Sequence, residues 1–574
     1  MHYWKALTLL RDRLALNTPT PLSLDTFTHE LGCTKRNAQL VVKKLVDNGV
    51  IRWQPSVGRG NFPSATLLKD PRPMLENKAR RWIEEGKVDL AVSLIAPQQR
   101  EAFIAAYIAR YQTGSHDEDI LQIPFYRGTH DLDPIGITRR TEQHLASYLY
   151  ANLLRFDEQA RCYRGDLAQI FQTTERGMAI TLRKGLCFHN GEPLTAESVR
   201  QHFERLVTTS EHYRLLYQLI DGIEVHDRYR LEIISSHARH ILPKLLCTGA
   251  MGIAFWTEGS EGRGANVIGS GPFELVEQTE WRTLMKVSRY YHGYRPWVDG
   301  IEVWNIGDKA KDFAPNSHLF HPLLELDNHE GEYEQKAQWE AGCEYVLFNA
   351  NRSAWLSSLN RRKKLMAIID ALGVPASFAD NVAKANGMLS TPSEPLQANL
   401  GLARQLAAQL DKPPKPLQLL TYELGQHIEY AHHLADLFSE LGILCQVLVL
   451  PFPEFCRKPN LSQADIILSG EVFSDDVDMS WLGWLLASTN VQVCLTDAQM
   501  QWLQQELASI YPLSESKRVK AYQSLEKKLI KKGLYLPRFH VQQNLSVAKS
   551  VTITELLSNG WVDFSEVVMT HASE

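Results

Sequence analysis

The chain has 574 residues, of which 44% are hydrophobic and 22% charged, and its formal net charge is −5. A chain of this length is too long for a single hydrophobic core, so we expect several structural units. The composition excludes a disordered or fibrous chain. The 8 cysteines form no C-x-x-C pair, which argues against a zinc ribbon or a redox dithiol and favours reduced thiols.

The N-terminus and the apolar runs predict a cytoplasmic protein. Residues 1–16 carry charges at helical intervals and no uninterrupted apolar run, unlike a signal peptide. A membrane-spanning helix needs roughly 18 apolar residues. The most apolar run, residues 441–452, is broken by Gln446, so we expect no membrane partner.

The N-terminal segment predicts three helices followed by a hairpin. A helix over residues 1–15 comes first, and Ser23 and Thr34 are N-cap residues that begin the second and third helices. Gly49 stands where the third helix ends, and residues 58–61 form a hairpin tip. The apolar stripe of the third helix has helical spacing and consists of Ala38, Val41, Val42, Leu45 and Val46. This order is typical of a winged helix-turn-helix.

The charge of this segment suits a polyanion. Residues 1–72 hold 11 Lys and Arg against 5 Asp and Glu, a net of +6, which leaves −11 for the remainder of the chain. Such a helix can also be no more than a solvated face, but the helix-turn-helix spacing and the Gly-Arg-Gly tip favour double-stranded DNA. The residues expected to contact DNA are Lys35, Arg36, Asn37, Gln39, Lys43 and Lys44 on the helix and Arg59 and Asn61 on the wing.

Residues 73–118 predict a helical connector. Three short helical patterns follow Pro73 and are broken near Gly86 and Pro97. The mixed-charge run at residues 78–82 is compatible with DNA contact, but we favour a connector packed between domains.

A resemblance to a known family begins at Asp119. Residues 180–206, ITLRKGLCFHNGEPLTAESVRQHFERL, closely resemble the signature of family 5 extracellular solute-binding proteins, the oligopeptide- and nickel-binding type. Four further segments are typical of that family and occur in its order: residues 131–134, 268–273, 295–301 and 346–349. The resemblance implies a two-lobed α/β fold, with lobe one at residues 119–343 and 537–574 and lobe two at residues 344–536.

The residue pattern of the second lobe agrees with this fold. Residues 417–422 predict a strand, residues 426–440 an amphipathic helix and residues 443–450 a second strand. Strand-helix-strand units of this kind build open α/β lobes, and ligands bind at the strand ends.

A winged helix ahead of a solute-binding module resembles the SgrR-type transcriptional regulators. Members of that family respond to sugar-phosphate stress by activating a small regulatory RNA. The resemblance implies a DNA-binding regulator that senses a small metabolite of the sugar-phosphate class. The alternative is a solute-binding component of a transporter whose N-terminal region is an appendage.

No motif of an enzyme or a metal site stands out. G-x-S-x-G, H-E-x-x-H and Walker motifs do not occur, so we expect no enzyme, no catalytic residue and no cofactor. Acidic and histidine residues at 321–330 fit a solvated loop better than a metal site. Asp475, Asp476 and Asp478 fit charges at a helix N-terminus.

The candidate ligand-binding residues lie at expected strand ends and at a helix start. Each alone also fits a surface ion pair or a packing aromatic, but together they favour a polar or anionic ligand gripped by arginine. The segment at residues 469–484 departs from the family's peptide-binding segment, which argues against a peptide. The candidates are Tyr126, Arg127, Arg139, Arg140, Trp256, Asn349 and Arg352.

Overall fold

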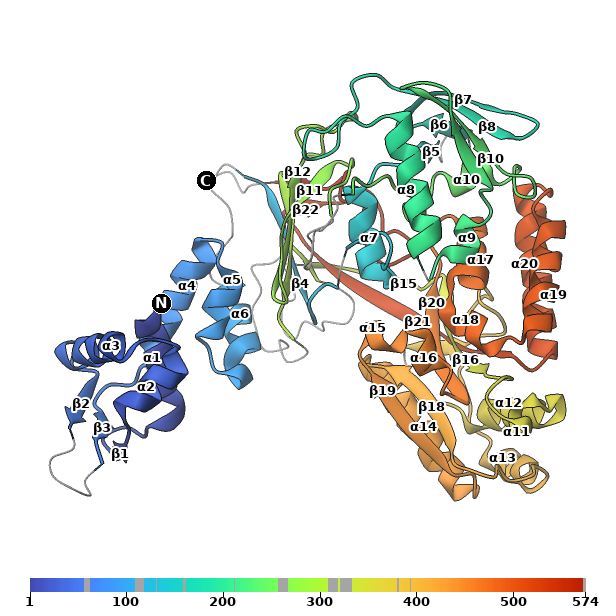
Figure 1. Ribbon diagram of the computed structural model, residues 1–574. Helices are drawn as coiled ribbons and strands as arrows, with labels where there is room; N and C mark the ends of the chain where they lie inside the picture. The colour runs from blue at the N-terminus through green and yellow to red at the C-terminus, as the bar shows by residue number, and fades with distance from the viewer. Residues whose placement is uncertain are drawn as a thin grey trace.

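An N-terminal unit, a helical connector and a two-lobed body follow one another along the chain in the computed structural model (Figure 1). The N-terminal unit projects from the body, and the connector lies between them. None of the described helices is long and apolar enough to cross a membrane. The structure describes residues 1–55, 62–108, 118–130, 132–157, 160, 162–210, 212–256, 267–307, 318–320, 333–378, 381–392 and 394–570.

The N-terminal unit has the predicted order of elements. Ser23 Oγ accepts the backbone N–H of Thr26 at 3.0 Å, and Thr34 Oγ1 accepts that of Asn37 at 3.4 Å, so both predicted N-caps are confirmed. Gly49 follows the third helix with a φ of +63°, a conformation that favours glycine. The elements are α1 (His2–Arg13), β1 (Pro19–Pro21), α2 (Leu24–Leu31), α3 (Lys35–Asp47), β2 (Ile51–Gln54) and β3 (Ser64–Leu67), with sheet order β1-β3-β2.

The connector contains the three predicted helices, broken around Gly86 and Pro97. They are α4 (Arg72–Glu84), α5 (Val88–Ser93) and α6 (Arg100–Ile108), with the short η1 (Pro97–Gln99) before α6. Their apolar side chains share one continuous hydrophobic core with those of the N-terminal unit. The same core includes Trp281, Trp304 and Ile306 of lobe one. The N-terminal unit is therefore packed onto the body through this core, not tethered to it by a loose linker.

Lobe one is built on a mixed sheet with strand order β11-β12-β13-β4, in which β4 and β13 are parallel. Successive side chains of a strand point to opposite faces. On β13, Ile301 and Val303 join the core that contains α7, whereas Trp304 joins the core of the connector. The sheet is therefore covered on both faces, which explains why β4 is buried along its whole length. The elements are β4 (Ile120–Phe125), α7 (Arg140–Leu149), β11 (Phe273–Gln278), β12 (Arg282–Val287) and β13 (Gly300–Asn305).

A second, antiparallel sheet completes lobe one, with strand order β7-β8-β10-β9. Thr195 begins its helix α8 with a capping box shared with Ser198, in the segment that resembles the family signature. The elements are β5 (Leu154–Asp157), β6 (Cys162–Gly165), β7 (Ala168–Thr173), β8 (Gly177–Leu182), α8 (Ala196–Thr209), α9 (Arg214–Tyr217), β9 (Gly222–Val225), β10 (Arg230–Ile234), α10 (Leu242–Leu245), η2 (Gly249–Met251), β22 (Val551–Thr552) and β23 (Val568–Met569).

Lobe two contains the predicted strand-helix-strand unit. β18 (Leu417–Tyr422), α14 (Gly425–Glu440) and β19 (Cys445–Leu450) follow in order, and the two strands are parallel neighbours. The sheet order is β14-β21-β16-β20-β18-β19. Its other elements are β14 (Leu319–Phe320), β16 (Gly342–Phe348), α11 (Ala354–Ser357), α12 (Leu359–Leu372), η4 (Ala376–Phe378), β17 (Val382–Lys384), α13 (Leu400–Ala408), α15 (Phe452–Phe455), α16 (Lys458–Leu461) and β20 (Ile466–Val472).

Two antiparallel segments connect the lobes. The long strand β21 (Tyr535–Ala548) pairs near its start with β16 and towards its end with β15 (Tyr333–Trp339). Figure 1 shows β21 running diagonally from one lobe to the other. Glu340 lies in the short link between β15 and β16. The chain therefore crosses between the lobes on paired strands, an arrangement suited to a hinge.

Helices α17 to α20, expected in lobe two, share their core with the second sheet of lobe one. Lys244 of α10 is 4% exposed, and its Nζ lies 3.1 Å from Asp476 Oδ1 and 3.1 Å from Glu515 Oε2. Asp476 also caps α17 by accepting the backbone N–H of Met479, which confirms the predicted helix N-terminus. One core thus joins these helices to the second sheet of lobe one and to strands β16, β18 and β20. The helices are α17 (Val477–Ala487), α18 (Thr489–Cys494), α19 (Asp497–Ile510) and α20 (Glu515–Lys531).

Candidate ligand cleft and DNA-binding surface

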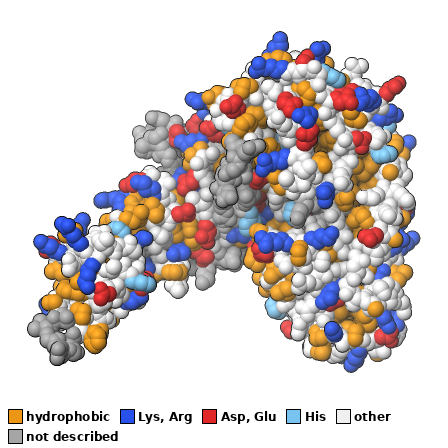
Figure 2. Space-filling model, in the orientation of Figure 1, with side chains coloured by type: hydrophobic (Ala, Val, Ile, Leu, Met, Phe, Trp, Pro, Cys, Tyr) orange, Lys and Arg blue, Asp and Glu red, His pale blue; other side chains and the backbone are white. Residues whose placement is uncertain are grey.

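Helix α3 presents a basic face to solvent. Its apolar stripe is buried at Ala38, Val41, Val42 and Leu45, and Figure 2 shows Lys and Arg side chains on the outer face of the N-terminal unit, where Figure 1 places α3. Of the residues expected to contact DNA, the exposed ones on α3 are Lys35, Arg36, Gln39, Lys43 and Lys44, and Asn37 is half-buried. Arg59 and Asn61 of the wing lie outside the described residues.

Two lysines of this face have partners within the N-terminal unit. Lys35 Nζ lies 3.2 Å from Asp25 Oδ1, and Lys44 Nζ lies 5.0 Å from the centre of the Tyr3 ring. Exposed pairs of this kind contribute about 0–1 kcal/mol, so a phosphate can replace the carboxylate at little cost. Neither contact removes these two lysines from the exposed face of the helix.

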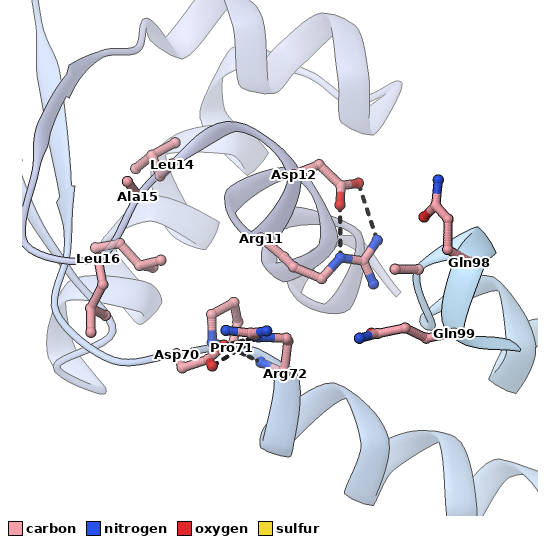
Figure 3. Close-up of a pocket in the computed structure, with 12 residues that line it drawn as sticks. Arg11, Asp12, Leu14, Ala15, Leu16, Asp70, Pro71, Arg72, Gln98 and Gln99 are labelled. Atoms are coloured by element: carbon pink, nitrogen blue, oxygen red, sulfur yellow. Dashed lines mark hydrogen bonds and ion pairs between the residues drawn. The ribbon is translucent and has the colours of Figure 1, made fainter. Parts of the chain in front are cut away.

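The junction between this unit and the connector is a polar groove of about 480 Å³ (Figure 3). Arg11, at the end of α1, pairs with Asp12 at 2.7 Å, and Arg72 pairs with Asp70 at 2.9 Å. Arg11 Nη1 also donates to the backbone oxygen of Leu94 at 2.5 Å. This hydrogen bond ties α1 to the end of α5 and so fixes the N-terminal unit on the connector.

An ion pair between Arg127 and Glu423 joins the two lobes at the strand ends. Arg127 follows β4 and Glu423 follows β18, and Arg127 Nη1 donates to Glu423 Oε1 at 3.0 Å. The guanidinium also lies over the ring of Tyr126, 4.6 Å from its centre. Two of the candidate ligand residues are thus brought together where the lobes meet.

Arg140 is held at the hinge. Its Nη1 donates to Glu340 Oε1 at 2.9 Å, which fixes the start of α7 to the link between β15 and β16. Burial raises the pKa of Glu340, and Glu344 adds to this, although Arg140 opposes it. Arg139 turns the other way: it is buried inside lobe one, where it pairs with Glu142 and its Nη2 donates to the backbone oxygen of Gly128 at 3.2 Å.

Carboxylates from lobe two line the same region. Glu344 of β16 and His427 of α14 form a hydrogen bond, in which Glu344 Oε2 and His427 Nε2 are 2.5 Å apart. Both side chains are buried. Glu471, near the end of β20, has a pKa raised to about 7, because burial outweighs the attraction of Arg140 and Glu344 adds repulsion. The cleft side of lobe two is thus acidic.

Aromatic rings close one side of this acidic region. Tyr422, the last residue of β18, packs with Phe452 at 4.8 Å, with Phe455 at 5.1 Å and with His427 at 4.5 Å between ring centres. Burial raises the pKa of Tyr422 well above its usual value, so the phenol stays neutral. Apolar rings beside a few polar groups are the usual composition of a small-molecule site.

The remaining candidates do not lie at this edge of the sheet. β16 is antiparallel to β20, and Gly342 pairs with Val472 whereas Phe348 pairs with Ile466. Asn349 therefore lies at the opposite end of β16 from Glu344, and its Nδ2 donates to the backbone oxygen of Ala464 at 3.1 Å.

Arg352 and Trp256 likewise have structural partners. Arg352 Nε donates to the backbone oxygen of Gln463 at 2.9 Å. Trp256 Nε1 donates to His202 Nδ1 at 3.0 Å, and Arg205 lies 4.4 Å from the centre of its ring, all within lobe one. Four further residues of this region, Glu340, Glu423, His427 and Glu471, were not predicted, because the sequence alone holds no signal that distinguishes them.

Among the residues that the structure describes, no group of three or more His, Cys, Asp or Glu side chains is placed to hold a metal ion. The polar stretch at 321–330 lies outside the described residues. In the cleft, both Arg127 and Arg140 have carboxylate partners. An anionic ligand would have to replace Glu423 or Glu340, whereas a hydrogen-bond donor or a cation could bind Glu471 directly.

One residue connects the cleft with the connector. Tyr126 packs against both the core of lobe one around α7 and the core shared by the connector and the N-terminal unit. On the connector side, the rings of Tyr107 in α6 and Trp304 in β13 are 6.0 Å apart. Gly307, just after β13, has a φ of +69°, a backbone conformation that favours glycine. Strand β4 and its neighbour β13 thus link the Arg127–Glu423 pair to the connector and the N-terminal unit.

Comparisons with known proteins match both parts of the chain. The profile described as bacterial extracellular solute-binding proteins, family 5 Middle, matches residues 164–493. The profile described as sugar transport-related sRNA regulator N-term matches residues 7–118.

Two curated relatives carry the name HTH-type transcriptional regulator SgrR. The protein from Salmonella choleraesuis (strain SC-B67) is 27% identical over 324 residues, and the match covers 56% of this chain and 56% of that protein, little more than half of its length. The protein from Yersinia pseudotuberculosis serotype I is 22% identical over 563 residues, which is 96% of each chain.

Solved structures share the fold of the body. OppA from Burkholderia pseudomallei has a TM-score of 0.63 at 16% identity, over 80% of this chain and 100% of that one. NikA from Staphylococcus aureus, in complex with Ni(L-His)2, has a TM-score of 0.61 at 15% identity, over 79% and 100%. The family 5 profile covers more than half of this chain. The chain therefore belongs to the bacterial extracellular solute-binding proteins of family 5, and its N-terminal residues match the profile of the sugar transport-related sRNA regulators.

Proposed function

We propose that this protein is a cytoplasmic, ligand-responsive transcriptional regulator. Helix α3 and the wing bind promoter DNA, and the two lobes close on a small metabolite. Closure changes the DNA affinity of the N-terminal unit through the connector. A ligand has this effect only if its affinity differs between the open and closed states.

The observation that carries this proposal is the continuous core from α3 to lobe one. An appendage on a transport component needs no such packing, but a regulator does. The core contains residues of α1, α2 and α3, of all three connector helices, and of β13. Because Tyr126 packs against this core and Arg127 follows it in the chain, a ligand that takes the place of Glu423 on Arg127 acts on a residue next to this core.

For the ligand we propose a sugar phosphate, the class that the family resemblance implies. Arginine binds phosphate with paired hydrogen bonds, and Arg127 is the cleft arginine whose carboxylate partner comes from the other lobe. In this scheme the phosphate takes the place of Glu423 on Arg127, and sugar hydroxyls donate to Glu471. An amine-bearing metabolite is the alternative that the acidic lining of lobe two favours.

A genomic footprint of the full chain tests the function. Cells are compared with and without a hexose phosphate load, and the control strain carries Arg36→Ala together with Lys43→Ala. The proposal predicts discrete protected promoter sites that depend on these two side chains and change in occupancy with the load. A footprint that is absent, or that the double substitution leaves unaltered, contradicts DNA binding by α3. Sites that persist with unchanged occupancy contradict only the sugar-phosphate response.

A further inference from the structure

Helix α3 carries a large apolar side chain on its basic face. Leu40 is 60% exposed, although Val41 and Val42 beside it are buried in the core. A leucine side chain that is exposed to water does not contribute the stabilising free energy that a buried leucine contributes. The fold of the N-terminal unit therefore does not explain why leucine stands at this position.

The surroundings of Leu40 define the kind of partner. Residues three and four apart share one face of a helix, so Leu40 lies between Arg36 and Asn37 on one side and Lys43 and Lys44 on the other. Arg36, Lys43 and Lys44 are exposed. A partner for this face must combine negative charge around its edge with an apolar group at its centre.

The major groove of DNA offers this combination. Its edges are phosphates, and within it the thymine 5-methyl is the apolar group that side chains contact. In helix-turn-helix proteins the N-terminal part of the second helix reads base edges. Leu40 is the sixth residue of α3, which begins at Lys35, and so lies within this part.

We propose that Leu40 is a specificity-determining residue that packs against the 5-methyl group of a thymine in the bound site. This inference rests on the proposed DNA-binding function. Arg36 and the lysines supply the phosphate and hydrogen-bonding contacts, and Leu40 selects thymine at one position of each half-site or site. Replacing that thymine by deoxyuridine removes only the methyl group and keeps the base pair. The expected loss is about fourfold in affinity, which corresponds to about 0.8 kcal/mol for one buried methyl group.

The test uses duplexes that the full-length protein selects from a random-sequence pool. Each thymine of the best duplex is replaced in turn by deoxyuridine, and the dissociation constants are measured for the wild type, Leu40→Ala and Val46→Ala. Val46 is the matched control, because it is also exposed, at 40%, but lies six residues further along the same helix, on a different face. Circular dichroism verifies that the variants are folded.

At one thymine, or one symmetry-related pair of thymines, we expect deoxyuridine to weaken DNA binding by the wild type and by Val46→Ala. DNA binding by Leu40→Ala should not weaken at that position. If the wild type tolerates deoxyuridine at every position while still preferring the selected sequence, the inference is overturned and DNA binding stands. A change in oligomeric state on Leu40→Ala, with an unaltered response to deoxyuridine, assigns Leu40 to a protein contact and also overturns it. If no duplex is selected at all, the DNA-binding function fails, and this inference with it.

Discussion

Arg127 and Glu423 form an ion pair across the two lobes, with 3.0 Å between Nη1 and Oε1. Arg127 is the second residue after strand β4 of lobe one, and Glu423 directly follows strand β18 of lobe two. The pair therefore joins the strand ends of the two sheets at the place where related folds bind ligands. Because both side chains are partly exposed, at 16% and 35%, a charged ligand can compete for either of them.

Glu423→Gln tests whether an anion competes with this carboxylate. We expect the variant to bind glucose 6-phosphate more tightly, by about 1 kcal/mol or roughly fivefold, because the phosphate no longer displaces a charged partner from Arg127. Isothermal titration calorimetry measures the affinity. Glu224→Gln is the control, since it removes a carboxylate that pairs with Arg176 on an exposed hairpin. Weaker binding by Glu423→Gln would exclude the exchange of partners at Arg127.

Glu471 predicts a pH dependence of stability. Its pKa is raised to about 7 in the folded protein from an ordinary value of 4.5. As the pH rises, Glu471 therefore loses its proton at a lower pH in the unfolded chain than in the folded protein. The free energy of unfolding falls as the pH rises from about 4.5 to 7. Glu471→Gln removes the effect. Relative to the wild type, the variant should gain about 2 kcal/mol of stability between pH 5 and pH 8.

Thermal unfolding of the two proteins at both pH values measures this difference. Glu440→Gln, at the exposed end of α14, serves as the control and should behave as the wild type does. A wild type and a Glu471→Gln variant whose melting temperatures differ by the same amount at pH 5 and pH 8 would show that the pKa of Glu471 is not raised in the folded protein.

Arg36 and Lys44 should contribute to DNA binding in different ways. If Arg36 reads a guanine, Arg36→Ala costs about 1–3 kcal/mol on the selected site and relaxes its base preference, whereas Lys44→Ala weakens specific and random duplexes alike and lowers the salt slope by about 1. Fluorescence anisotropy at several salt concentrations separates the two effects. Lys458→Ala, in lobe two, is the charge-matched control. Equal losses on specific and random DNA for Arg36→Ala would assign Arg36 to a phosphate.

The local features of this protein are predictable from its sequence, because they depend on neighbouring residues. The caps at Ser23 and Thr34 need only a hydroxyl and a backbone N–H three residues ahead. The strand-helix-strand unit around α14 follows in the same way from the spacing of its apolar residues.

The cleft is not predictable in this manner. Glu423 is 296 residues from Arg127, and no local pattern distinguishes it from other glutamates. Asn349 was expected near the ligand because it follows a strand, but the antiparallel direction of β16 in a mixed sheet takes it to the opposite end. Strand direction is a property of the assembled sheet, and the strand's own residues do not encode it.

Trp304→Leu is the variant that separates coupling from binding. Trp304 joins lobe one to the connector core, and its ring centre lies 6.0 Å from that of Tyr107. It belongs neither to the exposed face of α3 nor to the Arg127–Glu423 pair. Replacing a buried tryptophan by a smaller side chain lowers the free energy of unfolding by up to about 3–5 kcal/mol. Folding of the variant is therefore verified first. Trp297→Leu is the matched control, since Trp297 is 57% exposed in lobe one.

The most direct measurement is the DNA affinity of the full chain with and without a saturating metabolite that raises its melting temperature, in the wild type, Trp304→Leu and Trp297→Leu. We expect the metabolite to change the DNA affinity of the wild type and of Trp297→Leu, by about 1–3 kcal/mol if the coupling is of ordinary size. Trp304→Leu should bind DNA and metabolite separately with no coupling between them. If the DNA affinity of the wild type stays unchanged with the metabolite bound, metabolite binding and DNA binding are not coupled, and the proposed ligand response is contradicted.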